Sequence, residues 1–152
     1  GGTLAAVAAR HARDRGITLA GQALIYPPTD AAMDTPSYQD FAAGYYLSAD
    51  AMRWFYTHYL PAWAEGAHPD ASPLRADNVA GLAPVFIATA AFDPLRDEGR
   101  AYAAKLIEAG NDVTYREVAG AVHGLWIMNG KTPATERLIS ETAGWIARRL
   151  RS

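Results

Sequence analysis

Three segments of the chain have the hydrophobic pattern of strands in a buried sheet. APVFIATA at 83–90 is a run of apolar residues, rich in β-branched and small side chains, as in a strand that lies deep in a sheet. TLAGQALIYP at 18–27 is a second apolar run, which Pro27 and Pro28 end. DVTYREV at 112–118 alternates between hydrophobic and polar positions and predicts a third strand.

Helical spacing of apolar residues predicts four helices around these strands. The chain opens with an Ala-rich helix that Gly16 ends. A second helix begins at Ser48, a good N-cap, and stops at Pro61. Two more helices are predicted over 94–110 and 132–150. The residues of the last helix expected to face inward are Leu138, Trp145, Ile146 and Leu150.

The segment 29–82 interrupts this alternation and is predicted to be a helical excursion from the sheet. Apart from the helix that starts at Ser48, it is rich in turn residues, with one short helical turn expected at 77–81. Strands that alternate with helices predict an α/β fold with a parallel sheet and right-handed crossovers. In such sheets, reactive groups collect at the carboxyl ends of the strands.

Composition narrows the class of protein. The 152 residues suffice for one domain, and 50% hydrophobic with 20% charged residues is typical of a globular protein. A net charge of −2 gives no reason to expect nucleic acid or an anionic membrane as partner. The absence of cysteine excludes a thiolate nucleophile and a Cys-based zinc site. No apolar run reaches the roughly 18 residues of a membrane span.

Two strand ends carry a carboxylate and an imidazole. The second strand runs into AFDPLRDEG and so presents Asp93, while the third leads to AVHGLW and His123. We expect the two side chains to meet at one rim of the sheet, where Asp93 would orient the imidazole and stabilise its protonated form. Such a pair normally activates a nucleophile. No serine of this chain lies on a G-x-S-x-G elbow, so the nucleophile is expected outside it.

Several short motifs resemble one family. GG before an Ala-rich helix, LIYP, SPL, DPLRDEG followed by YAAKLIEAG, and HGLW are similar to the hormone-sensitive-lipase-like branch of the α/β-hydrolases. The resemblance covers nearly all of the chain, and DPLRDEG is its most specific match. Where the family usually has an aromatic residue after His-Gly, this chain has Leu125, with Trp126 following.

The resemblance implies that residues 1–152 are the C-terminal portion of an α/β-hydrolase domain. Gly1 and Gly2 would match the end of the family's GDSAGG elbow, so that the catalytic serine would lie two positions before Gly1. Asp93 would be the triad acid and His123 the general base. The implied activity is hydrolysis of short to medium acyl esters, without cofactor or metal. The N-terminal portion of the same protein would be the partner that supplies the serine and the oxyanion hole, and this chain alone would be inactive.

Structural alternatives exist for each of these residues. Asp93 could serve as a helix N-cap before Pro94, and His123 could be a structural histidine of a Gly-flanked loop. The residues His58, Glu65, His68 and Asp70 invite a metal interpretation, but their spacing fits no zinc motif. The aromatic residues of the excursion are expected to pack on the sheet. Four residues are also predicted as substrate-pocket walls: Tyr45, Tyr46, Leu125 and Trp126.

The sequence is compatible with two other functions. A non-catalytic binding protein of the same fold would keep the sheet and lack the upstream serine, and a peptidase or lactonase would keep the triad and differ in its pocket. A homo-oligomer is compatible with the sequence. No segment identifies the compartment, and a cytoplasmic location is favoured.

Overall fold

The computed structural model describes residues 1–151, in which strands and helices alternate as expected. The elements in chain order are α1 (Gly2–Asp14), β1 (Gln22–Ile25), α2 (Pro36–Asp40), α3 (Ala49–Tyr59), β2 (Val85–Phe92), α4 (Arg96–Glu108), β3 (Val113–Val122) and α5 (Pro133–Arg149). Short 3₁₀ helices span Trp63–Ala67, Pro73–Arg75 and Leu125–Met128. None of the helices described is long and apolar enough to cross a membrane.

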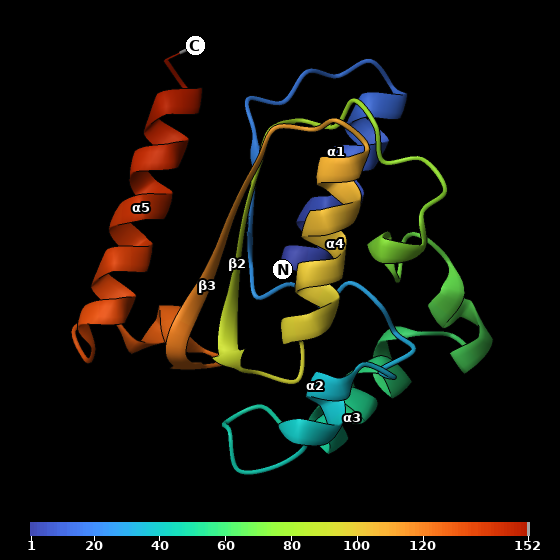
Figure 1. The fold of residues 1–152 in the computed structure, drawn as a ribbon. Helices are drawn as coiled ribbons and strands as arrows, with labels where there is room; N and C mark the ends of the chain where they lie inside the picture. Colours follow the sequence, from blue (N-terminus) through green and yellow to red (C-terminus); the bar gives the residue numbers. More distant parts are fainter. Residues whose placement is uncertain (152) are drawn as a thin grey trace.

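The three strands form one parallel sheet in the order β1-β2-β3. Figure 1 shows α5 on one side of this sheet and α1 with α4 on the other, so the molecule has three layers. Two crossovers through helices connect the parallel strands, as the geometry of parallel pairing requires. The α/β class and the parallel sheet predicted from the sequence are therefore confirmed.

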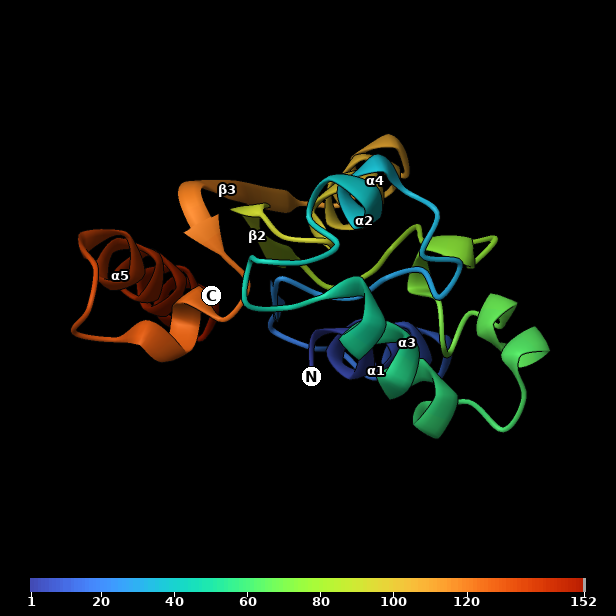
Figure 2. The ribbon, with the colours of Figure 1, turned by 90° about the horizontal axis from the view of Figure 1, so that it is seen from below.

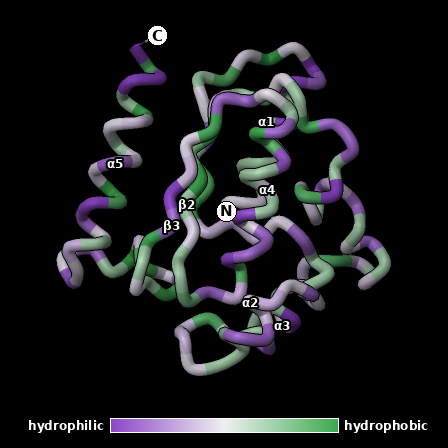
Figure 3. The backbone as a smooth tube through the Cα atoms, viewed as in Figure 1, coloured by the Kyte–Doolittle hydropathy of each residue, from purple (hydrophilic) through white to green (hydrophobic). Residues whose placement is uncertain are grey.

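The central strand β2 separates two hydrophobic cores, one on each face of the sheet. Val85 and Ile87 pack with residues of α1 and α4, whereas Phe86 and Ala88 pack with Leu138 and other residues on the side of α5. Both sets are buried because successive side chains of a strand point to opposite faces. In Figure 3, β2 is accordingly hydrophobic, while the neighbouring β3 carries hydrophilic stretches.

The pairing of β2 with β3 contains one irregularity near its carboxyl end. From Val85 to Ala90, each residue of β2 pairs with the residue 28 positions later, but Phe92 pairs with Val122, which lies 30 positions later. Two extra residues of β3 are therefore inserted there, and the positive φ of Gly120 (72°) lies in the inserted stretch. The irregularity places His123, the residue after Val122, level with Asp93, the residue after Phe92.

The part of the excursion that contains α2 and α3 lies beyond the carboxyl ends of the strands, whereas Ala76, Val79 and Leu82 return to the core beside α1 and α4. In Figures 1 and 2, α2 and α3 gather at the end of the sheet toward which β2 and β3 point. Tyr38, Met52, Tyr56 and Leu60 form a separate small core there with Leu95 of the β2–α4 connection. This core fixes the excursion over the rim where Asp93 and His123 emerge.

Three details of the sequence prediction are wrong. The helical turn expected at 77–81 lies instead at Pro73–Arg75, where proline provides a favourable first residue. The five-residue helix α2 was not predicted, since it is too short to show a period. In α5, Leu138 and Trp145 are buried as expected, but Ile146 and Leu150 are exposed because α5 buries a narrower stripe than the apolar residues suggest.

Candidate active site

Asp93 is completely buried directly after β2, and each of its carboxylate oxygens has a different partner. Oδ1 accepts a hydrogen bond from the main-chain N–H of Leu95 at 2.9 Å. Oδ2 lies 2.8 Å from Nδ1 of His123. The capping interpretation is wrong, because the N-cap of α4 is Leu95 and has no side-chain cap bond. The bond from Leu95 closes a turn before the helix instead, and the pairing of Asp93 with the histidine is present. These two contacts offset the cost of burying a carboxylate at this position.

His123 follows β3, and its imidazole is held on two sides. Nδ1 faces Asp93, and the ring of Tyr26 lies with its centroid 4.3 Å from the imidazole centroid. A carboxylate can only accept a hydrogen bond, so Nδ1 carries the proton when Asp93 is ionised. Nε2 then holds the lone pair and can act as a base. The next residue, Gly124, has a φ of 81° and allows the chain to turn away behind the imidazole.

A cavity of about 430 Å³ opens beside the imidazole, within the usual size range of small-molecule sites. The wall of this cavity contains His123, Tyr26 and the glycines Gly1 and Gly2 at the start of α1. Most of its apolar side chains come from the excursion and the β2–α4 connection: Leu47, Met52, Phe55, Tyr56, Tyr59 and Leu95. This arrangement places one basic nitrogen in an otherwise mostly apolar pocket.

The four residues predicted as pocket walls do not line this cavity. Tyr45 stacks on Phe92 with a centroid distance of 5.6 Å, and Tyr46 covers Gly124. Leu125 and Trp126 belong to the core on the side of α5. Their role in substrate binding stays a prediction. The α3 residues that do line the cavity are Met52, Phe55, Tyr56 and Tyr59. Helical spacing places these four residues on one face, but it does not reveal that this face meets the cavity.

A second carboxyl, that of Glu98 in the first turn of α4, is also buried, which the sequence does not predict. The side chain is completely buried, and its Oε1 accepts a hydrogen bond from the main-chain N–H of Thr29 at 2.9 Å. Burial raises the pKa of Glu98 well above its usual value, and the nearby charge of Asp30 acts in the same direction, against the lowering effect of the Thr29 N–H. Acidic residues are common in a first helical turn, so the sequence carried no signal of this burial.

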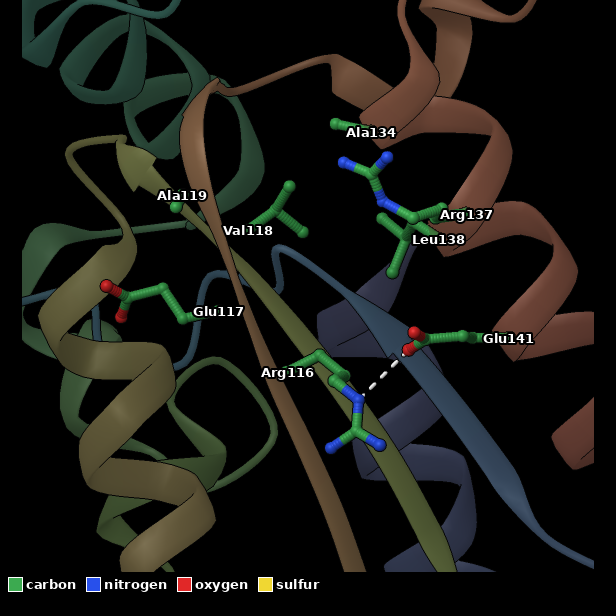
Figure 4. Close-up of a pocket in the computed structure, with 8 residues that line it drawn as sticks. All are labelled: Arg116, Glu117, Val118, Ala119, Ala134, Arg137, Leu138 and Glu141. Carbon is green, nitrogen blue, oxygen red and sulfur yellow. Dashed lines mark hydrogen bonds and ion pairs between the residues drawn. The ribbon is translucent and has the colours of Figure 1, made fainter.

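A second cavity lies away from the Asp93–His123 pair. Figure 4 shows a second hollow, between β3 and α5, whose charged groups include an ion pair of 2.9 Å between Arg116 and Glu141. The residues considered for a metal, which include His58, His68 and Asp70, do not line this hollow. Asp70 contacts Arg10 and His11 instead. Within residues 1–151, no group of three or more His, Cys, Asp or Glu side chains is placed to hold a metal ion.

The fold and the Asp93–His123 pair can be compared with known proteins. The family model described as alpha/beta hydrolase fold matches residues 1–127. Carboxylic ester hydrolase LipN of Mycobacterium tuberculosis (strain ATCC 25618 / H37Rv) is 39% identical over 158 aligned residues, which cover 97% of this chain and 42% of LipN. Ethyl acetate hydrolase of Pseudomonas putida is 39% identical over 102 residues, with 67% of this chain and 32% of that protein covered.

Solved structures of esterases are also similar to this chain. An esterase from Rhizomucor miehei superimposes with a TM-score of 0.94 at 39% identity, over 99% of this chain and 48% of the esterase chain. A thermostable esterase from Pseudomonas putida ECU1011 superimposes with a TM-score of 0.89, also at 39% identity, over 93% of this chain and 46% of the other. The chain thus spans less than half the length of each of these relatives.

Proposed function

The chain belongs to the α/β-hydrolase fold family, and from this premise we propose that it is the C-terminal portion of a carboxylic ester hydrolase with a Ser-His-Asp triad. In this proposal Asp93 is the acid, His123 is the general base, and the serine lies two positions before Gly1. The observation that carries the proposal is the 2.8 Å contact between Nδ1 of His123 and Oδ2 of Asp93, at a cavity that Gly1 and Gly2 also line.

The position of the two glycines supports a nucleophile on the preceding segment. Gly1 and Gly2 are at the start of α1 and share the cavity wall with His123. A side chain at Gly2 would collide with Pro27, since its Cβ would lie 2.7 Å from the Pro27 Cβ. The start of α1 is therefore packed tightly against the segment that leaves β1. A serine just before it would be close to the imidazole and at the N-terminus of a helix, where developing negative charge is stabilised.

The two residues of this chain would then divide the proton chemistry. His123 Nε2 would take the proton of the serine hydroxyl as that oxygen attacks the ester carbonyl, and would return it to the leaving alcohol. Asp93 would stay ionised, hold the proton-bearing Nδ1 and stabilise the imidazolium. A water molecule would then attack the acyl-serine ester with His123 again as the base, which releases the carboxylic acid and restores the serine hydroxyl. The apolar wall from α3 would receive the hydrocarbon part of a short to medium acyl ester.

Substitution of the pair tests this proposal in the protein that joins this chain to its preceding segment. Asp93→Asn should lower kcat for a 4-nitrophenyl ester by about 10⁴-fold with the fold retained, and His123→Ala should lower it at least as much. The matched controls are Asp50→Asn and His58→Ala, both at exposed positions of α3. Turnover near the unsubstituted level in either triad variant would overturn the assignment.

The origin of the nucleophile has its own test. The coding sequence immediately before Gly1 should specify a serine two positions upstream, and another residue there would instead favour a non-catalytic binding protein. Residues 1–152 alone should show no ester hydrolysis, because they contain neither the serine nor the oxyanion-hole donors. Hydrolysis by this chain that His123→Ala abolishes would contradict the proposal. A panel of esters, lactones and peptides would separate an esterase from a lactonase or a peptidase.

A further inference from the structure

Tyr26 adopts a backbone conformation that is rare for an aromatic residue. It follows β1 directly, and its φ is 37°, on the positive side that residues with a Cβ avoid. Its N–H still donates to the carbonyl of Ala88 at 2.6 Å, so the end of β1 holds it in place. Pro27 follows and is packed against Gly2. Strain of this kind persists only where the surroundings fix it, and it often accompanies function.

The strained conformation directs the Tyr26 ring onto the imidazole of His123. The two ring centroids are 4.3 Å apart and the planes are inclined by 54°. The single hydrogen bond from Nδ1 to Asp93 would leave the imidazole free to swing about the line that joins the two atoms. Contact with the Tyr26 ring closes one face of the imidazole and restricts that swing. Two different elements thus determine the direction of Nε2.

The Tyr26 hydroxyl lies near the same loop. The main-chain N–H of Trp126, three residues after His123, is close enough to lower the pKa of this hydroxyl. Burial raises the pKa of Tyr26, so the hydroxyl stays neutral and does not place a charge beside the imidazole. One side chain therefore contacts the imidazole and lies beside the backbone of the loop that carries it.

We propose that Tyr26 is a positioning residue for His123: its ring restricts the imidazole, and its hydroxyl anchors the loop that follows. The inference rests on the proposed function for its catalytic consequence, although not for its structural one. Tyr26 also lines the cavity, so a simple contact with substrate or plain core packing would be the competing explanations. The explanations predict different results for Tyr26 variants. Only a positioning role predicts that loss of the Tyr26 ring changes the tautomer and mobility of His123 in the absence of substrate.

Two variants separate the ring from the hydroxyl. Tyr26→Leu removes the aromatic face, and Tyr26→Phe removes only the hydroxyl. The matched control is Tyr115→Phe, because Tyr115 is also half-buried and its hydroxyl is bonded, 2.7 Å from Oγ1 of Thr89, but it does not line the cavity. Nuclear magnetic resonance of the imidazole nitrogens, with His123→Gln for assignment, reports the tautomer and mobility of His123 without any substrate.

Positioning predicts a distinct result for each variant. Tyr26→Leu should broaden the His123 signals and mix its tautomers, and Tyr26→Phe should leave the tautomer intact while raising the exchange rate of the Trp126 amide by about tenfold. In the hydrolase that includes the preceding segment, kcat should fall by about 100-fold for Tyr26→Leu and about tenfold for Tyr26→Phe, with KM changed by less than about twofold. Tyr115→Phe should alter none of these.

The two proposals fail in different ways. If Tyr26→Leu folds and keeps the unsubstituted His123 spectrum, the positioning role is overturned, whatever the activity. If Tyr26→Leu does not fold, an unchanged Trp126 exchange rate in Tyr26→Phe overturns it. A rise in KM with kcat unchanged would assign Tyr26 to substrate contact instead. Absence of ester hydrolysis in the unsubstituted protein would contradict the proposed function, while the spectra would still decide the role of Tyr26.

Discussion

Thr29 and Glu98, 69 residues apart, are joined by two hydrogen bonds in a fully buried position. The Thr29 N–H donates to Oε1 of Glu98, and the Thr29 hydroxyl donates to the main-chain carbonyl of Glu98, each at 2.9 Å. The pair ties the segment that leaves β1 to the first turn of α4. That segment also carries Tyr26 and Pro28, which line the cavity. The pair of hydrogen bonds therefore supports this part of the cavity lining.

The raised pKa of Glu98 predicts the direction of one pH effect on stability. Above its ordinary pKa of 4.5, the unfolded chain releases this proton while the folded protein keeps it. The free energy of unfolding should therefore fall as pH rises from about 4.5 through the raised pKa of the folded protein. Glu98→Gln keeps an acceptor for the Thr29 N–H, cannot ionise, and should remove this decline in urea titrations at a series of pH values.

Glu117→Gln is a control of opposite sign. The hydrogen bond from Arg100 lowers the pKa of Glu117, more than burial raises it, and the charge of Arg100 adds to the effect. This contribution to stability is present above the ordinary pKa and is lost as pH falls through the lowered one. Glu117→Gln should therefore cost stability at neutral pH and little at low pH. Equal pH profiles for the two variants would contradict the assignment of Glu98.

Gly124 should tolerate alanine less well than a glycine of similar backbone conformation in open space. Alanine would have to adopt the left-handed φ of 81°, and its Cβ would lie 2.7 Å from Cε1 of Tyr46. The backbone conformation alone costs about 1–2 kcal/mol. Gly130→Ala is the matched control, because φ is 75° there and no atom lies within 4 Å of the added Cβ. Urea denaturation should show a larger loss of unfolding free energy for Gly124→Ala than for Gly130→Ala. Equal losses would show that the Tyr46 side chain moves aside at no cost.

Gly99 should resist a substitution that normally favours a helix. Alanine in a helix interior is about 1 kcal/mol better than glycine, and Gly144→Ala in α5 should show this gain, because only the flexible end of Arg148 is nearby. At Gly99, the added Cβ would lie 2.7 Å from Cγ2 of Thr89. We expect Gly99→Ala to lower the melting temperature and Thr89→Ser to restore part of the loss in the double variant. A stabilised single variant would refute this.

Trp145 and Ile146 should differ sharply, although the sequence assigns both to the core. Trp145 is buried against Phe86 with a centroid distance of 6.0 Å, whereas Ile146 is 40% exposed. Trp145→Ala should cost about 3–5 kcal/mol of unfolding free energy, and Ile146→Ala less than about 1 kcal/mol. Calorimetry would measure both. A similar cost for the two would mean that α5 is rotated relative to this structure.

The sequence predicted the order of the main elements because each has a strong period or a clear stop signal. APVFIATA has the continuous apolar character of a strand covered on both faces, and Gly110 ends α4 as expected. The rotation of α5 could not be predicted, since Ile146 and Trp145 are adjacent and a helical period alone does not set the width of the buried stripe. Helix α2 has only five residues, fewer than two turns.

Part of the candidate site, the pair of Asp93 and His123, could be predicted from the sequence for a physical reason. Two strand ends of a parallel sheet lie at one rim, so the acid and the imidazole could be placed together from their positions alone. The identity of the cavity wall depends on how α3 packs, and the burial of Glu98 depends on a bond to Thr29 far away in the sequence. The unusual φ of Tyr26 had one trace in the sequence, the two prolines that follow it.

The irregular pairing near the end of β3 has a consequence for how this protein tolerates insertions and deletions. Ala119 and Gly120 add two residues to the chain without moving Val122 from its place opposite Phe92. If both residues were instead drawn into regular pairing with β2, the imidazole would project past the carboxylate by two residues, or about 7 Å. Loss of both residues would restore regular pairing and leave His123 level with Asp93, so a chain shortened by these two residues should keep the contact between the acid and the imidazole.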